Sequence, residues 1–161
     1  MPQHVPAPSF APGSRQPAAV RQGPNFSSAD YGPSAGWSEY LRQTRIGPFA
    51  GKVFLGQTLG MTGTEVSFGL LQPGQVYPFF HAHKQNEELY VFLSGQGELL
   101  VDGERIPVSA GSAVRIAPPA LRSWRATGPE PLAYLCIQAK AGSLDQATAT
   151  DGVLSDQPAP W

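Results

Sequence analysis

Apolar and polar residues alternate in short runs through the middle of the chain, and glycine or proline ends each run. In TEVSFGLLQPG (residues 64–74) the period is two, which is typical of a β-strand with one buried face. The dipeptide Asp102-Gly103 suits the tight turn of a hairpin. About nine such segments with no convincing helix between them predict an all-β barrel or sandwich. We expect strands within residues 52–60, 64–74, 75–83, 88–93, 95–101, 104–111, 112–119, 121–128 and 131–142.

The two ends of the chain lack this alternation. Residues 1–36 contain seven of the seventeen prolines and almost no aliphatic residues. Such a segment buries too little apolar area to offset its ordering entropy, so we expect a disordered arm rich in Pro, Gly and Ala. Residues 141–161 are small and polar and are expected to form a flexible tail, which leaves residues 46–140 as the folded domain. Three aromatic residues of the arm can dock onto the domain or onto a partner subunit: Phe10, Phe26 and Tyr31.

Composition narrows the classes of function. The 161 residues suffice for one domain, and charged residues make up only 14%, below the usual ~25%. The net charge of -1 gives no broad attraction to polyanions, so we expect neither nucleic acid nor a membrane as a partner. The single cysteine, Cys136, excludes an intrachain disulfide and is expected to be a buried structural thiol. Because the chain shows neither a membrane-span pattern nor a signal-peptide pattern, we expect a cytoplasmic protein.

Two of the three histidines form the pair His81 and His83. On a strand these imidazoles would share a face, and Glu88 opens the next apolar run, which can lie beside them. Two imidazoles and one carboxylate suit one divalent ion of Fe, Mn, Ni, Cu or Zn and leave positions open for water or substrate. Glu87 is the alternative ligand, since neighbouring strand residues face opposite ways and one of the two can reach the ion. A chance His-x-His pair without a metal is the other alternative.

The spacing G-x6-H-x-H-x4-E-x6-G, from Gly74 to Gly95, resembles the first conserved motif of the cupin superfamily, with one additional residue before the first histidine. The resemblance extends over about residues 64–140. It implies a single jelly-roll β-barrel over residues 46–140 that binds a small-molecule ligand, and it implies a homodimer. It also implies that three residues hold one divalent metal ion at the mouth of the barrel: His81, His83 and Glu88.

The chain departs from the second cupin motif, in which a histidine normally completes the metal site. The second motif has the form G-x5-P-x-G-x2-H-x3-N. When it is aligned with the chain from Gly111, Arg122 stands at the position of the histidine. Arginine stays protonated, and at about 5 Å each unit charge of a dication would repel it by roughly 3 kcal/mol at an effective dielectric of about 20. Three alternatives stay open. Arg122 points to solvent, pairs with Glu88 in a site without metal, or binds an anionic substrate through its planar fork.

Aromatic residues share the faces of the predicted ligands. By strand parity, Tyr77 and Phe79 lie on the face of His81, and Tyr90 lies on the face of Glu88. They are expected to line a substrate cavity, although such side chains also fill ordinary cores. The expected substrate-binding residues are therefore Arg122, Tyr77, Phe79 and Tyr90.

Resemblance to cupins does not determine an activity, because the superfamily includes dioxygenases, isomerases, epimerases, decarboxylases, sugar-binding regulators and storage proteins. We expect a small metal-binding protein, an oxygenase or an isomerase of a small organic molecule, with Arg122 orienting an anionic substrate. No catalytic acid or base is identifiable from the sequence. One alternative is a ligand-binding or sensory module in which metal is structural or absent. Another is a structural or oligomerisation role.

Overall fold

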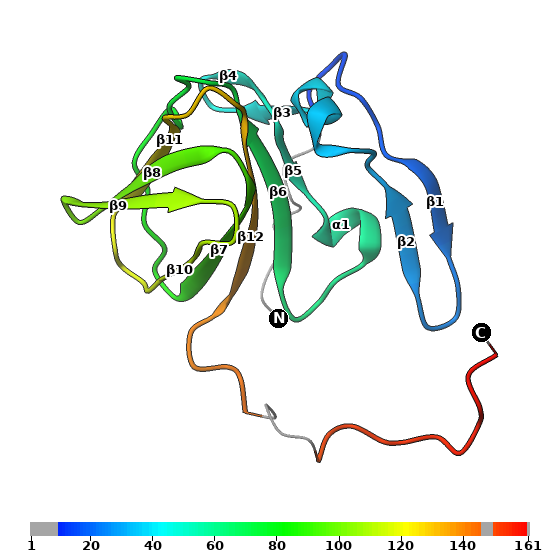
Figure 1. Cartoon of the computed structure of the whole chain (residues 1–161). Helices are drawn as coiled ribbons and strands as arrows, with labels where there is room; N and C mark the ends of the chain where they lie inside the picture. The colour runs from blue at the N-terminus through cyan, green and yellow to red at the C-terminus, as the bar shows by residue number, and fades with distance from the viewer. Residues whose placement is uncertain (1–9, 146–149, 161) are drawn as a thin grey trace.

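The structure is a computed structural model that describes residues 10–145 and 150–160, and strands make up most of its regular structure (Figure 1). The two short helices are the 3-10 helix η1 (Ser34–Glu39) and α1 (Gly56–Leu59). The strands are β1 (Ala18–Gln22), β2 (Ser27–Asp30), β3 (Leu41–Thr44), β4 (Gly47–Ala50), β5 (Lys52–Phe54), β6 (Glu65–Leu71), β7 (Asn86–Ser94), β8 (Gln96–Val101), β9 (Glu104–Ser109), β10 (Ala113–Ile116), β11 (Arg122–Ala126) and β12 (Leu132–Lys140).

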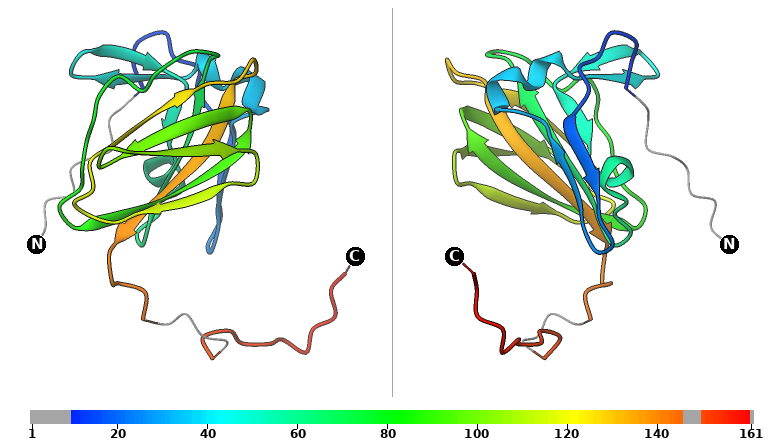
Figure 2. Two further views of the ribbon diagram at one scale, coloured as in Figure 1. Left: turned by 60° about the vertical axis from the view of Figure 1, so that its left-hand side comes forward. Right: turned by 90° about the vertical axis from the view of Figure 1, so that its right-hand side faces the viewer.

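Two antiparallel sheets face each other and enclose the main core (Figure 2). One sheet has the strand order β10-β7-β12-β6-β5, and the other has the order β11-β8-β9. Every second residue of β7 is buried, from Glu88 through Tyr90 to Phe92, as the alternation predicts. The aromatic side chains of this row pack with Leu99 and Trp124 from the smaller sheet. The expected all-β fold, a single jelly-roll barrel, is confirmed.

The turn between β8 and β9 lies where the sequence predicts it. Asp102 and Gly103 have φ angles of 48° and 88°, which a two-residue hairpin turn of this kind requires. Because Gly and Asp enter the left-handed region more readily than most residues, this dipeptide sets the register of the hairpin.

The segment before β7 differs from the expectation. A strand is predicted over residues 75–83, but the structure has isolated bridges there, both to β11. Pro78 lies between the bridges and has no N–H to donate, so it interrupts the ladder. The backbone still follows β11, since the His81 N–H donates to the Arg122 carbonyl (3.2 Å) and the Arg122 N–H donates to the His81 carbonyl (3.0 Å). This extended segment brings His81 alongside the small sheet.

Residues 10–36 are ordered, whereas the sequence predicts a disordered arm there. β1 and β2 form a hairpin, and η1 follows it. Trp37 stacks on Phe68 of β6 with ring centroids 4.0 Å apart, and Tyr31 meets the same ring edge-on at 5.2 Å. These rings belong to a second core on the outer face of the five-stranded sheet. A few aromatic side chains thus supply the apolar area that a count of aliphatic residues misses.

The boundaries of the domain change accordingly. Phe10 and Tyr31 pack against the second core as the docking hypothesis predicts, while Phe26 stays 52% exposed. Residues 1–9 of the predicted arm lie outside the described residues. The folded domain begins before residue 46, because Tyr40 is already fully buried.

At the other end of the chain, residues 141–145 and 150–160 contain neither helix nor strand, and the flexibility of this tail stays a prediction. In the described part of the chain, no helix combines the length and the apolar character needed to cross a membrane.

Candidate metal centre

A cavity of about 270 Å³ lies inside the barrel, against the inner face of the five-stranded sheet. Its wall combines aromatic rings with ionisable side chains from segments that are far apart in the sequence. It is lined by Arg42, Lys52, Phe54, Glu65, Ser67, Tyr77, Phe79, His81, His83, Glu88, Tyr90, Trp124, Cys136 and Gln138.

The three predicted metal ligands meet at this wall. One potential ligand atom from each of His81, His83 and Glu88 lies within 4.8 Å of the others. His83 Nε2 is 2.9 Å from Glu88 Oε1. The two imidazole rings lie almost perpendicular to each other, with centroids 5.6 Å apart. Within the described residues this is the one group of three or more His, Cys, Asp or Glu side chains able to share an ion.

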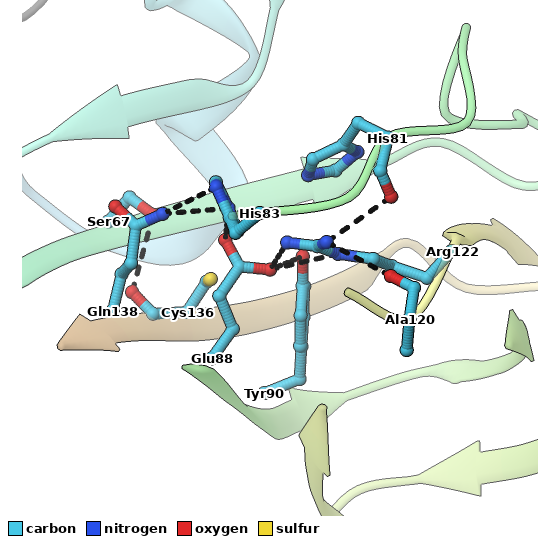
Figure 3. A network of polar contacts seen from close by, with 9 residues as sticks. All are labelled: Ser67, His81, His83, Glu88, Tyr90, Ala120, Arg122, Cys136 and Gln138. Carbon is cyan, nitrogen blue, oxygen red and sulfur yellow. Dashed lines mark hydrogen bonds and ion pairs between the residues drawn. The ribbon is translucent and has the colours of Figure 1, made fainter. Parts of the chain in front are cut away.

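The two carboxylate oxygens of Glu88 have different partners (Figure 3). Oε1 faces His83, whereas Oε2 accepts hydrogen bonds from the Tyr90 hydroxyl (2.9 Å) and from Arg122 Nε (3.1 Å) and Nη2. Burial acts to raise the pKa of Glu88, but the hydrogen bond with His83, the charge of Arg122 and the hydrogen bonds from Arg122 and Tyr90 lower it to about 2. Glu88 is therefore ionised at neutral pH.

Glu87, the alternative ligand, lies outside the cavity lining and pairs with Arg115 at the surface. The register of β7 thus selects Glu88, as the motif spacing predicts.

His81 is neutral over the ordinary pH range. Burial, together with the nearby positive charge of Arg122, lowers its pKa to about 4. Its Nδ1 atom is buried and has no hydrogen-bond partner in the described structure. Because buried polar atoms are normally paired, this imidazole is available to an additional ligand.

His83 has a neighbour that the motif does not include. The side-chain amide nitrogen of Gln138 lies 2.7 Å from His83 Nε2. Gln138 sits on β12 directly opposite Glu88 of β7, so the strand register brings it to the centre. The alternation of β12, in which Tyr134 and Cys136 face inward, was the sequence signal that could have identified Gln138.

Arg122 is 1% exposed, which excludes the alternative in which it points to solvent. Its Nη1 donates to the carbonyls of His81 (3.2 Å) and Ala120 (3.3 Å), while Nε and Nη2 donate to Glu88. Arg122 is not among the residues that line the cavity. The ion pair with Glu88 that one alternative foresees is therefore present. The absence of metal that the same alternative includes, and the contact of Arg122 with substrate, stay predictions.

The predicted aromatic wall is present. Tyr77, Phe79 and Tyr90 all line the cavity, and Tyr77 stacks on Trp124 with ring centroids 3.9 Å apart. Contact of these three residues with a substrate stays a prediction. The wall residues that precede the motif carry no signal in the sequence, because they come from strands with no recognisable spacing to the histidines: Arg42, Lys52, Phe54, Glu65 and Ser67.

Known proteins share this architecture. A family model for the cupin domain matches residues 67–138. A crystal structure of a cupin protein from Bacteroides fragilis is 49% identical to this chain, with a TM-score of 0.62, and the match covers 65% of this chain and 88% of that one. The plu4264 protein from Photorhabdus luminescens has the same fold at 15% identity, with a TM-score of 0.53 and coverage of 63% and 81%. No curated protein matches the chain significantly. The fold, the intact first motif and these matches together show that the chain belongs to the cupin superfamily.

Proposed function

We propose that this cupin holds one divalent metal ion through His81, His83 and Glu88 and acts on a small organic molecule in the adjoining cavity, as an oxygenase or an isomerase. The observation that carries the proposal is the convergence of three suitable ligand atoms within 4.8 Å at a cavity wall. This donor set suits Fe, Mn, Ni, Cu or Zn. When bound, such an ion would act as a Lewis acid that polarises a substrate oxygen.

The three side chains can hold one ion once they move closer together. Ligand atoms lie about 2.1 Å from such an ion, so adjacent ligands are about 3 Å apart and opposite ligands about 4 Å. The 2.9 Å between His83 Nε2 and Glu88 Oε1 corresponds to adjacent positions. His81 can be opposite only one of these two ligands, so its separations, which lie within 4.8 Å, need to close by up to about 2 Å. The unpartnered Nδ1 of His81 is a further reason to expect a ligand at this ring.

Neighbouring residues prepare the centre. Arg122 and Tyr90 bind Glu88 Oε2, which leaves Oε1 directed toward His83. The arginine in place of a fourth histidine thus orients a ligand and offsets its charge. Gln138 can supply a fourth protein ligand to the ion. Rotating its side-chain amide by half a turn would place the amide oxygen where the nitrogen now lies, near His83.

The cavity limits the size of the substrate. Its volume of about 270 Å³ corresponds to about nine water molecules in the liquid. Tyr77 and Phe79 offer apolar surface to an organic skeleton, whereas the Tyr90 hydroxyl is already bound to Glu88. A compact organic molecule with a metal-binding oxygen fits these conditions.

A second candidate is a ligand-binding module without turnover. The buried pair of Arg122 and Glu88 favours it, because this pair is complete without an ion. In this case removal of metal with EDTA would leave the affinity for the ligand unchanged.

Metal content decides between these candidates. Protein purified without an affinity tag or chelator should contain about one equivalent of Fe, Mn, Ni, Cu or Zn by elemental analysis. His81→Ala/His83→Ala should lose it because two of the three ligands are gone. His4→Ala, which replaces the histidine outside the motif, is the matched control and should retain it.

Stoichiometric metal in the double variant would contradict the ligand assignment. Failure of the wild-type protein to take up any of these metals on reconstitution would also contradict it, and the binding module would then be the better description.

A further inference from the structure

Two cations line the cavity away from the metal centre, and the first is Lys52 on β5. This side chain is 4% exposed, and its Nζ lies 5.2 Å from the ring centroid of Tyr134 and 5.4 Å from that of Phe54. None of the ion pairs among the described residues includes Lys52. Aromatic faces attract an ammonium group, but they provide no hydrogen-bond acceptor comparable to the water that it loses on burial.

Arg42 on β3 is the second cation. Its Cζ lies 4.4 Å from the ring centroid of Phe54, so the same ring contacts both cations. Its Nε is buried without a hydrogen-bond partner in the described chain, and no ion pair of that part of the chain includes it. Because nearly all buried polar groups are paired, an unpaired guanidinium nitrogen indicates a missing acceptor.

The carboxylates of the cavity do not supply that acceptor. Glu88 is bound by Arg122 and faces His83. Glu65 accepts a hydrogen bond from the Gly56 N–H at 2.8 Å and forms no ion pair within the described residues. The wall around Lys52 and Arg42 therefore carries an excess of positive charge, and a metal ion would increase it.

The sheet sets the distance between these cations and the metal centre. β5 and β7 are three strand spacings apart in the five-stranded sheet, or about 14 Å between backbones. Lys52 and Glu88 extend from these strands toward the same cavity of about 270 Å³. A small molecule in this cavity can contact the side chains of both strands.

We propose that Arg42 and Lys52 form an anion subsite that binds the carboxylate of a small organic acid, while another oxygen of the same molecule reaches His81, His83 and Glu88. The second contact rests on the proposed metal function, whereas the first does not. The planar fork of an arginine binds a carboxylate through two parallel hydrogen bonds, and the ammonium adds a third charged donor. Burial lowers the pKa of Lys52, and a bound carboxylate would oppose that shift.

The test is isothermal titration with malonate as the probe, on metal-free and metal-loaded protein. Lys52→Met and Arg42→Gln should each weaken malonate binding by about tenfold or more, because each removes a charge-assisted hydrogen bond. The matched controls are Lys140→Met and Arg45→Gln, which replace exposed cations and should bind malonate as the wild-type protein does. Malonamide, which has the same skeleton without charge, should bind at least about tenfold more weakly than malonate.

Two further measurements distinguish an anion subsite from a structural role of Lys52 and from binding at the metal alone. Lys52→Met should keep or raise the melting temperature, since it removes a buried unpaired charge. A lower melting temperature together with unchanged malonate binding would show that Lys52 has a structural role. In His81→Ala/His83→Ala, loss of metal with malonate binding retained would support the subsite independently of the metal. Malonate binding equal to wild type in both Lys52→Met and Arg42→Gln would overturn the proposal, and so would tighter binding of inorganic phosphate than of malonate.

Discussion

At the scale of single residues, Glu88 is bound by an arginine that stands where the second cupin motif has a histidine. Its Oε2 is held by Tyr90 and Arg122, and its Oε1 faces His83. The same guanidinium donates to the carbonyls of His81 and Ala120, so it also anchors the backbone beside the centre. Arg122 is therefore a positioning residue for Glu88, and in the proposed anion subsite the carboxylate of a ligand binds Arg42 and Lys52 instead.

The buried ion pair leads to a stability prediction. Arg122→Met should lower the free energy of unfolding by about 3–5 kcal/mol, because it leaves the Glu88 charge buried without its cation. The pKa of Glu88 should rise from about 2 in the same variant. Urea denaturation followed by circular dichroism measures the loss.

The surface pair of Arg115 on β10 and Glu87 on β7 provides the control. Both side chains reach solvent there, so Arg115→Met should cost no more than about 1 kcal/mol. Similar losses in the two variants would mean that burial does not determine the strength of the Glu88 pair.

The lowered pKa of His81 predicts how the stability of the metal-free protein depends on pH. Its pKa is about 4 in the folded protein and 6.5 in the reference state, chiefly because burial disfavours the charged ring. Between these values the unfolded state binds more protons than the folded state, so stability falls as the pH is lowered from 6.5 to 4. Glu88, with a pKa lowered to about 2, stays ionised in the folded state through this window.

Urea midpoints of EDTA-treated protein at a series of pH values measure this dependence. The midpoint of the wild-type protein should fall more steeply between pH 6.5 and 4 than that of His81→Gln. Equal slopes in the two proteins would refute the assignment to His81.

At the scale of elements, the extended segment along β11 and the N-terminal hairpin differ most from the sequence expectations. Pro78 removes a ladder donor, yet the hydrogen bonds between His81 and Arg122 keep the segment in place. The N-terminal segment folds because a few aromatic rings, among them those of Tyr31 and Trp37, pack against Phe68 on the outer face of β6. Both outcomes depend on partners that are distant in sequence.

Trp37 should therefore be essential to the N-terminal part of the domain. Trp37→Ala should cost about 3–5 kcal/mol, because it removes a buried ring stacked on Phe68. Limited proteolysis should then cut within residues 10–36 faster than in the wild-type protein. Phe26→Ala is the control, since that ring is 52% exposed and its loss should cost about 0.5 kcal/mol or less. Equal effects of the two substitutions would contradict the role of the second core.

At the scale of the whole molecule, one cavity joins parts of the chain that local patterns treat separately. Arg42 comes from β3, directly after the predicted arm, and Lys52 from an edge strand of the large sheet. The candidate metal ligands come from β7 and from the segment before it. The proposed anion subsite depends on this convergence. The homodimer and the cytoplasmic location stay predictions.

The period-two alternation, the Asp102-Gly103 turn and the His-x-His motif with Glu88 are local features of the sequence. The structure has the expected turn and brings the three side chains of the motif together, while metal binding stays a prediction. Alternation specifies which face of a strand is buried, so it predicts the barrel and places Glu88 on the inner face of β7. It does not specify which strands become neighbours or where long side chains end. Gln138 reaches His83 through the register of β12 with β7, and Arg42 and Lys52 enter the cavity through the packing of β3 and β5. Those contacts join residues far apart in sequence, and they exist only once the chain has folded.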